Sequence, residues 1–238
     1  MRIRNRIKGW LHTVGFDVVR YVPECNRPFD VLSLVVREFM RKIDEPFFFV
    51  QVGANDGILD DPLRKLVLEH HLNGLLIEPL PDLFERLVEN YAESRGLIFE
   101  NVAIDTKPGT VPIHRVRKGP STPKHWDGIA SLDKRHLIKE GVNELNIETV
   151  EVKAVTMQSL LSKHNIKKID LLQVDTEGYD YAIVKSVIEA GFRPGIINYE
   201  HCHLVPKIRL ASKRLLEAND YRFIEVGKDS LAVRGWGI

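Results

Sequence analysis

The chain has 238 residues, of which 44% are hydrophobic and 28% are charged, and its formal net charge at pH 7 is +1. This length fits one large domain with a small appendage and is enough to bury a substantial core. The near-neutral charge gives no reason to expect a nucleic-acid partner, because proteins that bind nucleic acids typically carry a strong excess of basic residues. Cys25 and Cys202 are the only cysteines, which excludes a disulfide framework and a cysteine-rich zinc site.

The N-terminal part, residues 1–45, is predicted to be a helical extension. Its basic start could contact an anionic membrane surface or an acidic partner, but a solvated helix packed over the domain is the favoured interpretation. Residues 31–43 have helical periodicity. No apolar run approaches the length of a membrane span and no signal peptide is visible, so we expect a cytoplasmic enzyme. The basic residues at the start are Arg2, Arg4, Arg6 and Lys8.

Residues 47–57, Phe-Phe-Phe-Val-Gln-Val-Gly-Ala-Asn-Asp-Gly, form the most informative stretch. The apolar part predicts a strand buried on both faces, and Gly53 and Gly57 allow a sharp turn close to a ligand. Asp61-Pro62 then predicts a helix start. A strand, glycine turn and helix of this kind form the ligand pocket of open α/β sheets. The glycine spacing differs from that of dinucleotide folds and of P-loops.

Predicted strands and helices alternate along the rest of the chain. Residues 109–116 are expected to form a hairpin with the strand 97–104, and residues 117–147 to form a long polar loop or lid. This order predicts an α/β, doubly wound sheet with a C-terminal β-hairpin, in a domain covering residues 46–238. Further strands are predicted at 74–78, 149–155, 168–175, 194–203, 221–226 and 230–233. Helices are predicted from Pro81, at 157–164, in the segment that ends at Gly191, and at 206–219.

Acidic side chains stand at the ends of three predicted strands: Glu78, Asp175 and Glu200. Glu78 follows a short apolar strand and precedes a proline. In nucleotide-binding α/β folds an acid at this point accepts hydrogen bonds from ribose hydroxyls. The alternative is a surface glutamate without function.

Five segments carry a more specific pattern: residues 49–57, 76–79, 100–104, 169–178 and 196–201. These segments and their order resemble the FkbM family of S-adenosylmethionine-dependent methyltransferases, which have the class I, Rossmann-like fold. Gln51 is one departure, because many methyltransferases of this class carry an acid there, although a glutamine can still hydrogen-bond the methionine part of the cofactor.

The resemblance implies S-adenosylmethionine as the cofactor. The turn would border its amino-acid part, Glu78 would hold the ribose, and Asn101 to Ala103 would lie near the adenine. Asp175 would lie near the sulfonium or the amine, where a carboxylate suits a cation. The turn residues implied are Gly53, Ala54, Asn55, Asp56 and Gly57.

Methyl transfer to oxygen also needs a route for the hydroxyl proton. His201 is the first candidate for a general base, because an unperturbed imidazole is largely neutral at pH 7. A buried structural histidine is the alternative. Glu200 and His201 alternate along an extended strand, so both cannot face the ligand there. A sharper hypothesis is that Asp175, Glu200 and His201, or His203, bind Mg²⁺ or Mn²⁺, which would position the hydroxyl and lower its pKa.

The leading prediction is an O-methyltransferase that acts on a hydroxyl of a sugar, glycan or secondary metabolite. A nucleotide-dependent oxidoreductase and a non-catalytic binding domain on the same fold are the alternatives. Trp126, Ser131, His136 and His203 are expected to contribute to the acceptor site. The acceptor itself and the oligomeric state stay open at this point.

Overall fold

The computed structural model describes residues 30–117, 119, 122, 126 and 128–235. The basic start of the predicted extension lies outside the described residues. The first described element is helix α2 (Val31–Met40). Among the described helices, none combines the length and the apolar character needed to cross a bilayer.

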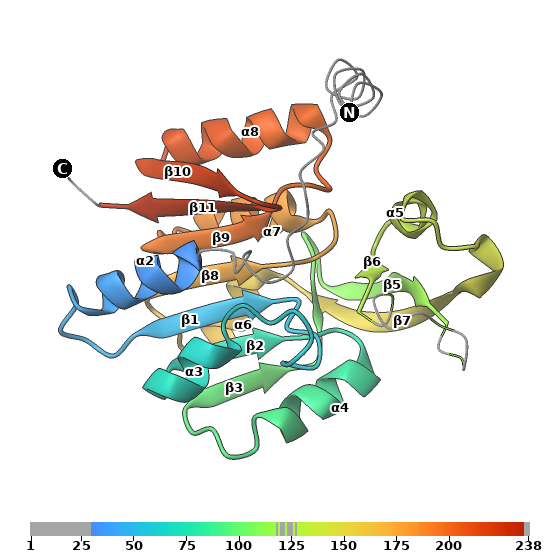
Figure 1. Ribbon diagram of the computed structural model, residues 1–238, viewed down its shortest axis with the longest axis horizontal. Coiled ribbons are helices and arrows are strands. Elements are labelled where there is room, and N and C mark those ends of the chain that lie inside the picture. Colours follow the sequence, from blue (N-terminus) through green and yellow to red (C-terminus); the bar gives the residue numbers. More distant parts are fainter. Residues whose placement is uncertain (1–29, 118, 120–121, 123–125, 127, 236–238) are drawn as a thin grey trace, which may run out of the picture. The chain divides into compact units, whose positions relative to one another are not determined.

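The main sheet has seven strands in the order β10-β11-β9-β8-β1-β2-β3 (Figure 1). Neighbouring strands from β9 to β3 are parallel, whereas β11 is antiparallel to both β9 and β10. The predicted doubly wound sheet and its terminal hairpin are therefore confirmed. The strands are β1 (Phe48–Val52), β2 (Asn73–Ile77), β3 (Leu97–Glu100), β8 (Leu171–Val174), β9 (Ile196–Glu200), β10 (Tyr221–Val226) and β11 (Asp229–Arg234).

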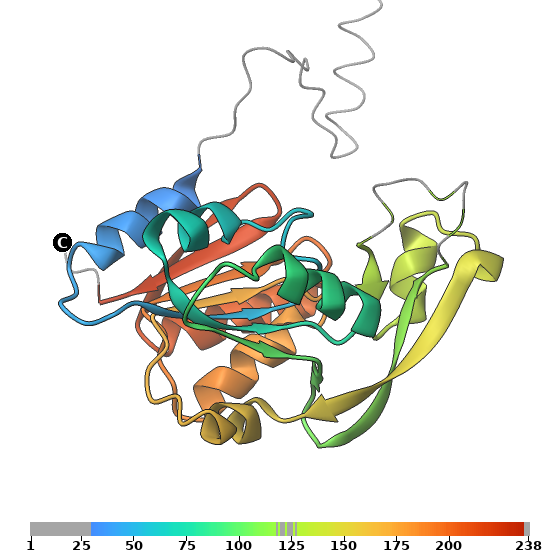
Figure 2. The same ribbon diagram turned by 90° about the horizontal axis from the view of Figure 1, so that it is seen from below.

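Helices cover both faces of this sheet (Figures 1 and 2). Helices α2, α3 (Arg64–His70) and α4 (Pro81–Asn90) supply one core cluster. Helices α6 (Met157–Lys163), α7 (Asp180–Glu189) and α8 (Pro206–Glu217) supply the other. The central strands lie between these two layers, which explains why their sequences are almost continuously apolar.

Strand β1 shows the division between the two faces. Val50 and Val52 pack in the cluster that contains α6 and α7, while Phe49 packs in the cluster that contains α2 and α3. Side chains alternate across a strand, so a strand covered on both faces favours apolar residues on both; Gln51 is the one polar residue of β1. Burying an aliphatic or aromatic side chain of this size contributes about 1.5–3 kcal/mol.

Helix α2 belongs to the core of the domain. Val36 is fully buried, and Leu32 and Val35 join it in the cluster with Phe47 and Phe49. The compact unit accordingly starts at Val31 and not at residue 46. The amphipathic pattern of this segment explains the packing, because its apolar face needs a partner surface.

A second, four-stranded sheet has the order β4-β7-β5-β6. Strand β5 (Gly109–Val116) pairs antiparallel with β7 (Ile147–Val155) along its whole length, so the predicted hairpin with 97–104 is wrong. The chain leaves the main sheet after Glu100, and β4 (Ala103–Ile104) joins β7 instead. Asn101 stabilises the break, because its amide donates to the carbonyls of Glu78 and Pro79.

The segment predicted as an irregular loop contains regular elements. Strand β6 (Ala130–Ser131), helix α5 (Lys134–Lys139) and the 3₁₀ turn η2 (Glu144–Asn146) lie within it. The Asp133 carboxylate caps α5 by accepting from the Arg135 N–H, and Leu137 is fully buried in a small cluster of its own. We call residues 103–155 the insert; Figure 2 shows it extending from the main sheet on the side where the parallel strands end.

Gly53 gives a direct test of the close packing in this fold. Its φ is +80°, and a Cβ added there would lie 1.8 Å from the Asp175 carbonyl oxygen. We expect Gly53→Ala to lower the free energy of unfolding by at least about 2 kcal/mol, because left-handed strain adds to backbone overlap. Gly109→Ala is the matched control, since a Cβ there meets nothing within 4 Å. Urea unfolding measures both, and an unchanged Gly53→Ala would contradict the close approach.

Candidate active site

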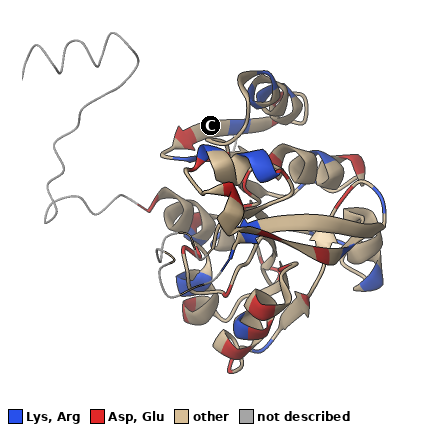
Figure 3. Cartoon of the chain, turned by 90° about the vertical axis from the view of Figure 1, so that its right-hand side faces the viewer, with Lys and Arg blue, Asp and Glu red and all other residues tan. Residues whose placement is uncertain are grey.

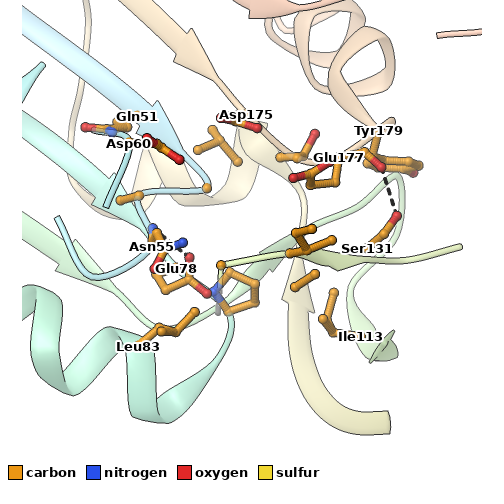
Figure 4. Close-up of a pocket in the computed structure, with 18 of the residues that line it drawn as sticks. Gln51, Asn55, Asp60, Glu78, Leu83, Ile113, Ser131, Asp175, Glu177 and Tyr179 are labelled. Atoms are coloured by element: carbon orange, nitrogen blue, oxygen red, sulfur yellow. Dashed lines mark hydrogen bonds between the residues drawn. The ribbon is translucent and has the colours of Figure 1, made fainter. Parts of the chain in front are cut away.

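A cavity of about 390 Å³ lies at the carboxyl ends of the parallel strands, between the main sheet and the insert. Its volume is in the range of small-molecule sites. Figure 4 shows Asn55 and Glu78 together at one end, with Glu177 and Ser131 at the other and Asp175 between them. The edge of the sheet at which the sequence predicts a ligand is therefore where the cavity lies.

The turn after β1 forms one wall. The N–H groups of Gly53 and Ala54 both donate to the carbonyl of Ile77, at 3.0 and 3.1 Å, which holds the turn against the end of β2. Asn55 has a positive φ of 49°, and its N–H donates to Glu78 Oε2 at 2.9 Å. The backbone therefore lines the cavity at close range, as the glycine of this turn predicts.

Glu78 is buried at the end of β2, and its carboxylate faces the cavity. Each oxygen accepts one backbone hydrogen bond, from Asn55 and from Leu80. Burial raises the pKa of Glu78 to about 7. A carboxylate oxygen can accept more than one hydrogen bond, so both retain capacity for ligand hydroxyls.

Gln51 lies beneath the turn and is 2% exposed. Its Nε2 donates to Asp61 Oδ1 at 3.1 Å, and its Oε1 is buried with no hydrogen-bond partner among the described residues. Asp61 also accepts from the N–H groups of Leu63 and Arg64, but the predicted helix start at Asp61-Pro62 is wrong, because α3 begins at Arg64 with Leu63 as its N-cap. A buried acceptor without a donor is costly, which makes Gln51 Oε1 a candidate contact for a cationic ligand group.

Strand register explains why acidic groups converge on the cavity. Gln173 on β8 lies opposite Asn198 on β9, and the two amides are hydrogen-bonded at 2.9 Å. Residues two positions further along a strand lie on the same face, so Asp175 and Glu200 leave the sheet on this side together. Carboxylate oxygens of Asp175, Glu177 and Glu200 lie within 4.8 Å of one another.

Two histidines join these acids. His136 Nε2, from helix α5 of the insert, lies 2.8 Å from Glu177 Oε2. His203 Nε2, from the turn after β9, lies 3.3 Å from the same oxygen and 3.3 Å from Glu200 Oε2. We call His136, Glu177, Glu200 and His203 the acceptor-end cluster.

Burial and like charge shift the pKa values of these groups. Burial, reinforced by the neighbouring Glu200, raises the pKa of Asp175 well above its usual range. Burial and the charge of Glu177 raise the pKa of Glu200 to about 7. The hydrogen bond to Glu177 raises the pKa of His136, whereas burial lowers that of His203. Such concentrated perturbation is typical of functional sites.

His201 lies outside this cluster. It is 4% exposed, its N–H donates to the Lys228 carbonyl, and its Nδ1 lies 3.1 Å from the Ser230 hydroxyl. It is not among the described residues that line the cavity. The placement does not agree with the expected roles of His201 as base or metal ligand, because the strand alternation that turns Glu200 toward the cluster turns His201 away.

Some of the other predicted site residues line the cavity, and others lie outside its described lining. Asp56 pairs with Arg86 and Gly57 packs against Tyr91 and Leu87, so both support the turn from behind. Trp126 packs beside the Leu137 cluster. The predicted residues that line the cavity are Gln51, Gly53, Ala54, Asn55, Glu78, Ala103, Ser131, Asp175 and His203; those outside its described lining are Asp56, Gly57, Asn101, Trp126, His136, Glu200 and His201.

Hydrogen bonds join the insert to the loop after β8. Ser131 Oγ donates to the Glu177 carbonyl at 2.9 Å, and the Tyr179 hydroxyl donates to Asp105 at 2.6 Å. Glu177 and Tyr179 were not predicted as site residues. The signal that could have identified them is their position shortly after Asp175, in the loop that follows strand β8 and contains Gly178.

Comparisons with known proteins agree with this geometry. A family model described as a methyltransferase FkbM domain matches residues 51–223. The hexuronic acid methyltransferase AglP of Haloferax volcanii is 25% identical over 158 residues, which cover 66% of this chain and 56% of that protein. The match thus spans little more than half of the relative's length.

A solved structure gives a likeness of fold. The methyltransferase FkbM from Methylobacillus flagellatus KT is 12% identical, with a TM-score of 0.50, and the alignment covers 80% of this chain and 44% of that chain. At this identity the likeness concerns the fold alone.

The raised pKa of Glu78 predicts a pH dependence of stability. The folded state binds this proton more tightly than the unfolded state, so the stabilisation is complete below about pH 4.5 and is lost as the pH rises through about 7. Between pH 5 and 8 we expect wild type to lose roughly 2 kcal/mol more unfolding free energy than Glu78→Gln.

Urea unfolding at the two pH values measures the difference. Glu225→Gln is the control, because Arg209 and Lys213 lower the pKa of Glu225 to about 2, outside this window. Equal pH dependence in wild type and Glu78→Gln would contradict the assignment.

Proposed function

The chain belongs to the FkbM methyltransferase domain family, and on this basis we propose that it is an S-adenosylmethionine-dependent O-methyltransferase acting on a hydroxyl of a sugar, glycan or secondary metabolite. The observation that carries the proposal is the single cavity that joins the turn after β1 and Glu78 to the acceptor-end cluster. A transferase needs two adjoining subsites of this kind.

The residues present fit the cofactor. Glu78 has acceptor capacity for two hydroxyls, Gln51 Oε1 is a buried acceptor without a donor among the described residues, and the Gly53 turn leaves no Cβ between backbone and ligand. Asp175, between the two ends, suits a positively charged centre. When bound, S-adenosylmethionine supplies an electrophilic methyl group that an acceptor oxygen can take in one displacement.

The acceptor hydroxyl would lie at the other end, beside Ser131 and the acceptor-end cluster. Holding two reactants in line supplies a large part of the acceleration of such a transfer. The proton of the hydroxyl would pass to the cluster. The pKa of Glu200 is raised to about 7, so its carboxylate can accept a proton near neutral pH.

The acceptor class rests on two supports. The relative from Haloferax volcanii is named for a hexuronic acid, which is a sugar derivative. The carboxylates at this end of the cavity also favour a hydroxyl, which donates hydrogen bonds to them. Figure 3 shows basic and acidic positions intermingled over the described face that carries the insert, which favours a small acceptor over a nucleic acid.

Titration calorimetry with S-adenosylmethionine, its demethylated product and NAD tests the proposal. We expect the two sulfur compounds to bind and NAD not to bind. Glu78→Gln should weaken binding at least about tenfold, or about 1.4 kcal/mol, through loss of charge-assisted hydrogen bonds. Glu100→Gln is the matched control, because this buried glutamate ends the neighbouring strand β3 but pairs with Lys163 and His164, away from the cavity.

The same titration separates the alternatives. Binding of NAD instead would favour the nucleotide-dependent oxidoreductase. Folded protein that binds none of the three compounds would favour the non-catalytic binding domain. Once the cofactor is established, transfer of a labelled methyl group to a panel of sugars and glycans would identify the acceptor.

A further inference from the structure

We propose that the acceptor-end cluster binds one divalent transition-metal ion, held by His136, Glu177 and His203 with Glu200 beside them. The three donor atoms of His136, Glu177 and His203 lie within 4.8 Å of one another, and those of Glu200 and His203 form an overlapping group with Cys202. Binding of the ion is independent of the proposed function, whereas its part in catalysis rests on that function.

The spacing of the donors fits one ion. His136 Nε2 and His203 Nε2 lie 2.8 and 3.3 Å from Glu177 Oε2, and His203 Nε2 lies 3.3 Å from Glu200 Oε2. Two donors bound tetrahedrally at metal–ligand distances of about 2.0–2.1 Å lie roughly 3.3 Å apart. Small side-chain adjustments would therefore bring His136, Glu177 and His203 into one coordination shell, with Glu200 next to it through His203.

Glu200 provides a second, independent observation. The residue is 7% exposed, and its Oε2 is fully buried and accepts no hydrogen bond from any described residue. The nearest donor, His203 Nε2, can carry one hydrogen and stands at the same distance from Glu177. A buried carboxylate oxygen that no described group hydrogen-bonds, beside one imidazole and two further carboxylates, offers a free lone pair to a cation.

Fixed positive charge near these carboxylates is weak. Lys228 Nζ lies 3.9 Å from Glu200 Oε1, but three-quarters of its side chain is exposed, so water screens it. Asp175 adds a further carboxylate within 4.8 Å of those of Glu177 and Glu200. A bound dication would offset this excess of negative charge.

Two imidazoles and two carboxylates select the kind of ion. Imidazole suits Zn²⁺ and other first-row transition metals, and Mn²⁺ also accepts carboxylates, whereas Mg²⁺ prefers an oxygen shell and keeps several waters. The cluster therefore favours Mn²⁺ or Zn²⁺ over Mg²⁺. Of the two histidines predicted as alternatives, His203 and not His201 belongs to the proposed site, and His136 joins it, while Asp175 is left to face the cofactor.

The ligands come from three separate segments. His136 lies on α5 of the insert, Glu177 in the loop after β8, and His203 in the turn after β9. An ion there would bind the insert to the main sheet at the acceptor end of the cavity. In the proposed reaction it would orient the acceptor hydroxyl and lower its pKa.

Calorimetric titration of the EDTA-treated, dialysed full chain with MnCl₂, ZnCl₂ and MgCl₂ tests the proposal. We expect one saturable site for Mn²⁺ or Zn²⁺, bound at least about tenfold more tightly than Mg²⁺. Electron paramagnetic resonance of added Mn²⁺ gives a second reading, because the signal of the free ion decreases on binding. Absence of saturable binding of all three ions to folded protein would overturn the proposal.

Substitutions locate the site. His136→Ala, His203→Ala and Glu177→Gln should each weaken binding at least about tenfold. His164→Ala is the matched control, because His164 also contacts a buried glutamate, Glu100, but shares it with Lys163 instead of a second histidine. Binding that survives both histidine substitutions would overturn the assignment.

Folding is monitored separately by thermal unfolding in EDTA. If an alanine variant unfolds, His136→Gln and His203→Gln replace it, because they keep side-chain bulk without the imidazole. Titration of S-adenosylmethionine in EDTA distinguishes the two proposals. Cofactor binding without metal binding would overturn the metal site alone, and metal binding without cofactor binding would overturn the proposed function alone.

Discussion

The close approach of the β1 turn to the end of β8 is the constraint on which the site depends. Gly53 has a positive φ, and its Cα lies so near the Asp175 carbonyl that no side chain fits between them. This contact, together with the two hydrogen bonds to Ile77, holds the ends of β1, β2 and β8 in one fixed arrangement. The backbone of the turn can then line the cavity while Glu78 and Asp175 lie at fixed positions around it.

The insert completes a site that the main sheet begins. Strands β5 and β7 form its frame, and the hydrogen bonds of Ser131 and Tyr179 connect it to the loop after β8. Helix α5 then places His136 beside Glu177. The end of the cavity proposed for the cofactor thus consists mainly of main-sheet residues, whereas the end proposed for the acceptor combines residues of both parts.

Electrostatics distinguishes the two ends. At one end the Glu78 carboxylate accepts two backbone hydrogen bonds and retains capacity for hydroxyls. At the acceptor end several carboxylates lie close together, and burial with mutual repulsion raises the pKa values of Asp175 and Glu200. A positively charged ligand group or the proposed cation would relieve this repulsion.

The sequence alone determined the fold and most of the cofactor end. Apolar strands, glycine turns and acids at strand ends are local signals, and they predicted the doubly wound sheet, the turn at Gly53 and the positions of Glu78 and Asp175. Strand alternation also indicated that Glu200 and His201 face opposite ways. Tertiary structure decided the rest. It determined that Glu200 and not His201 joins the acceptor-end cluster, that β5 pairs with β7, and that His136 contacts Glu177 across 41 residues. Such contacts depend on how distant segments pack, for which no local pattern in the chain is diagnostic.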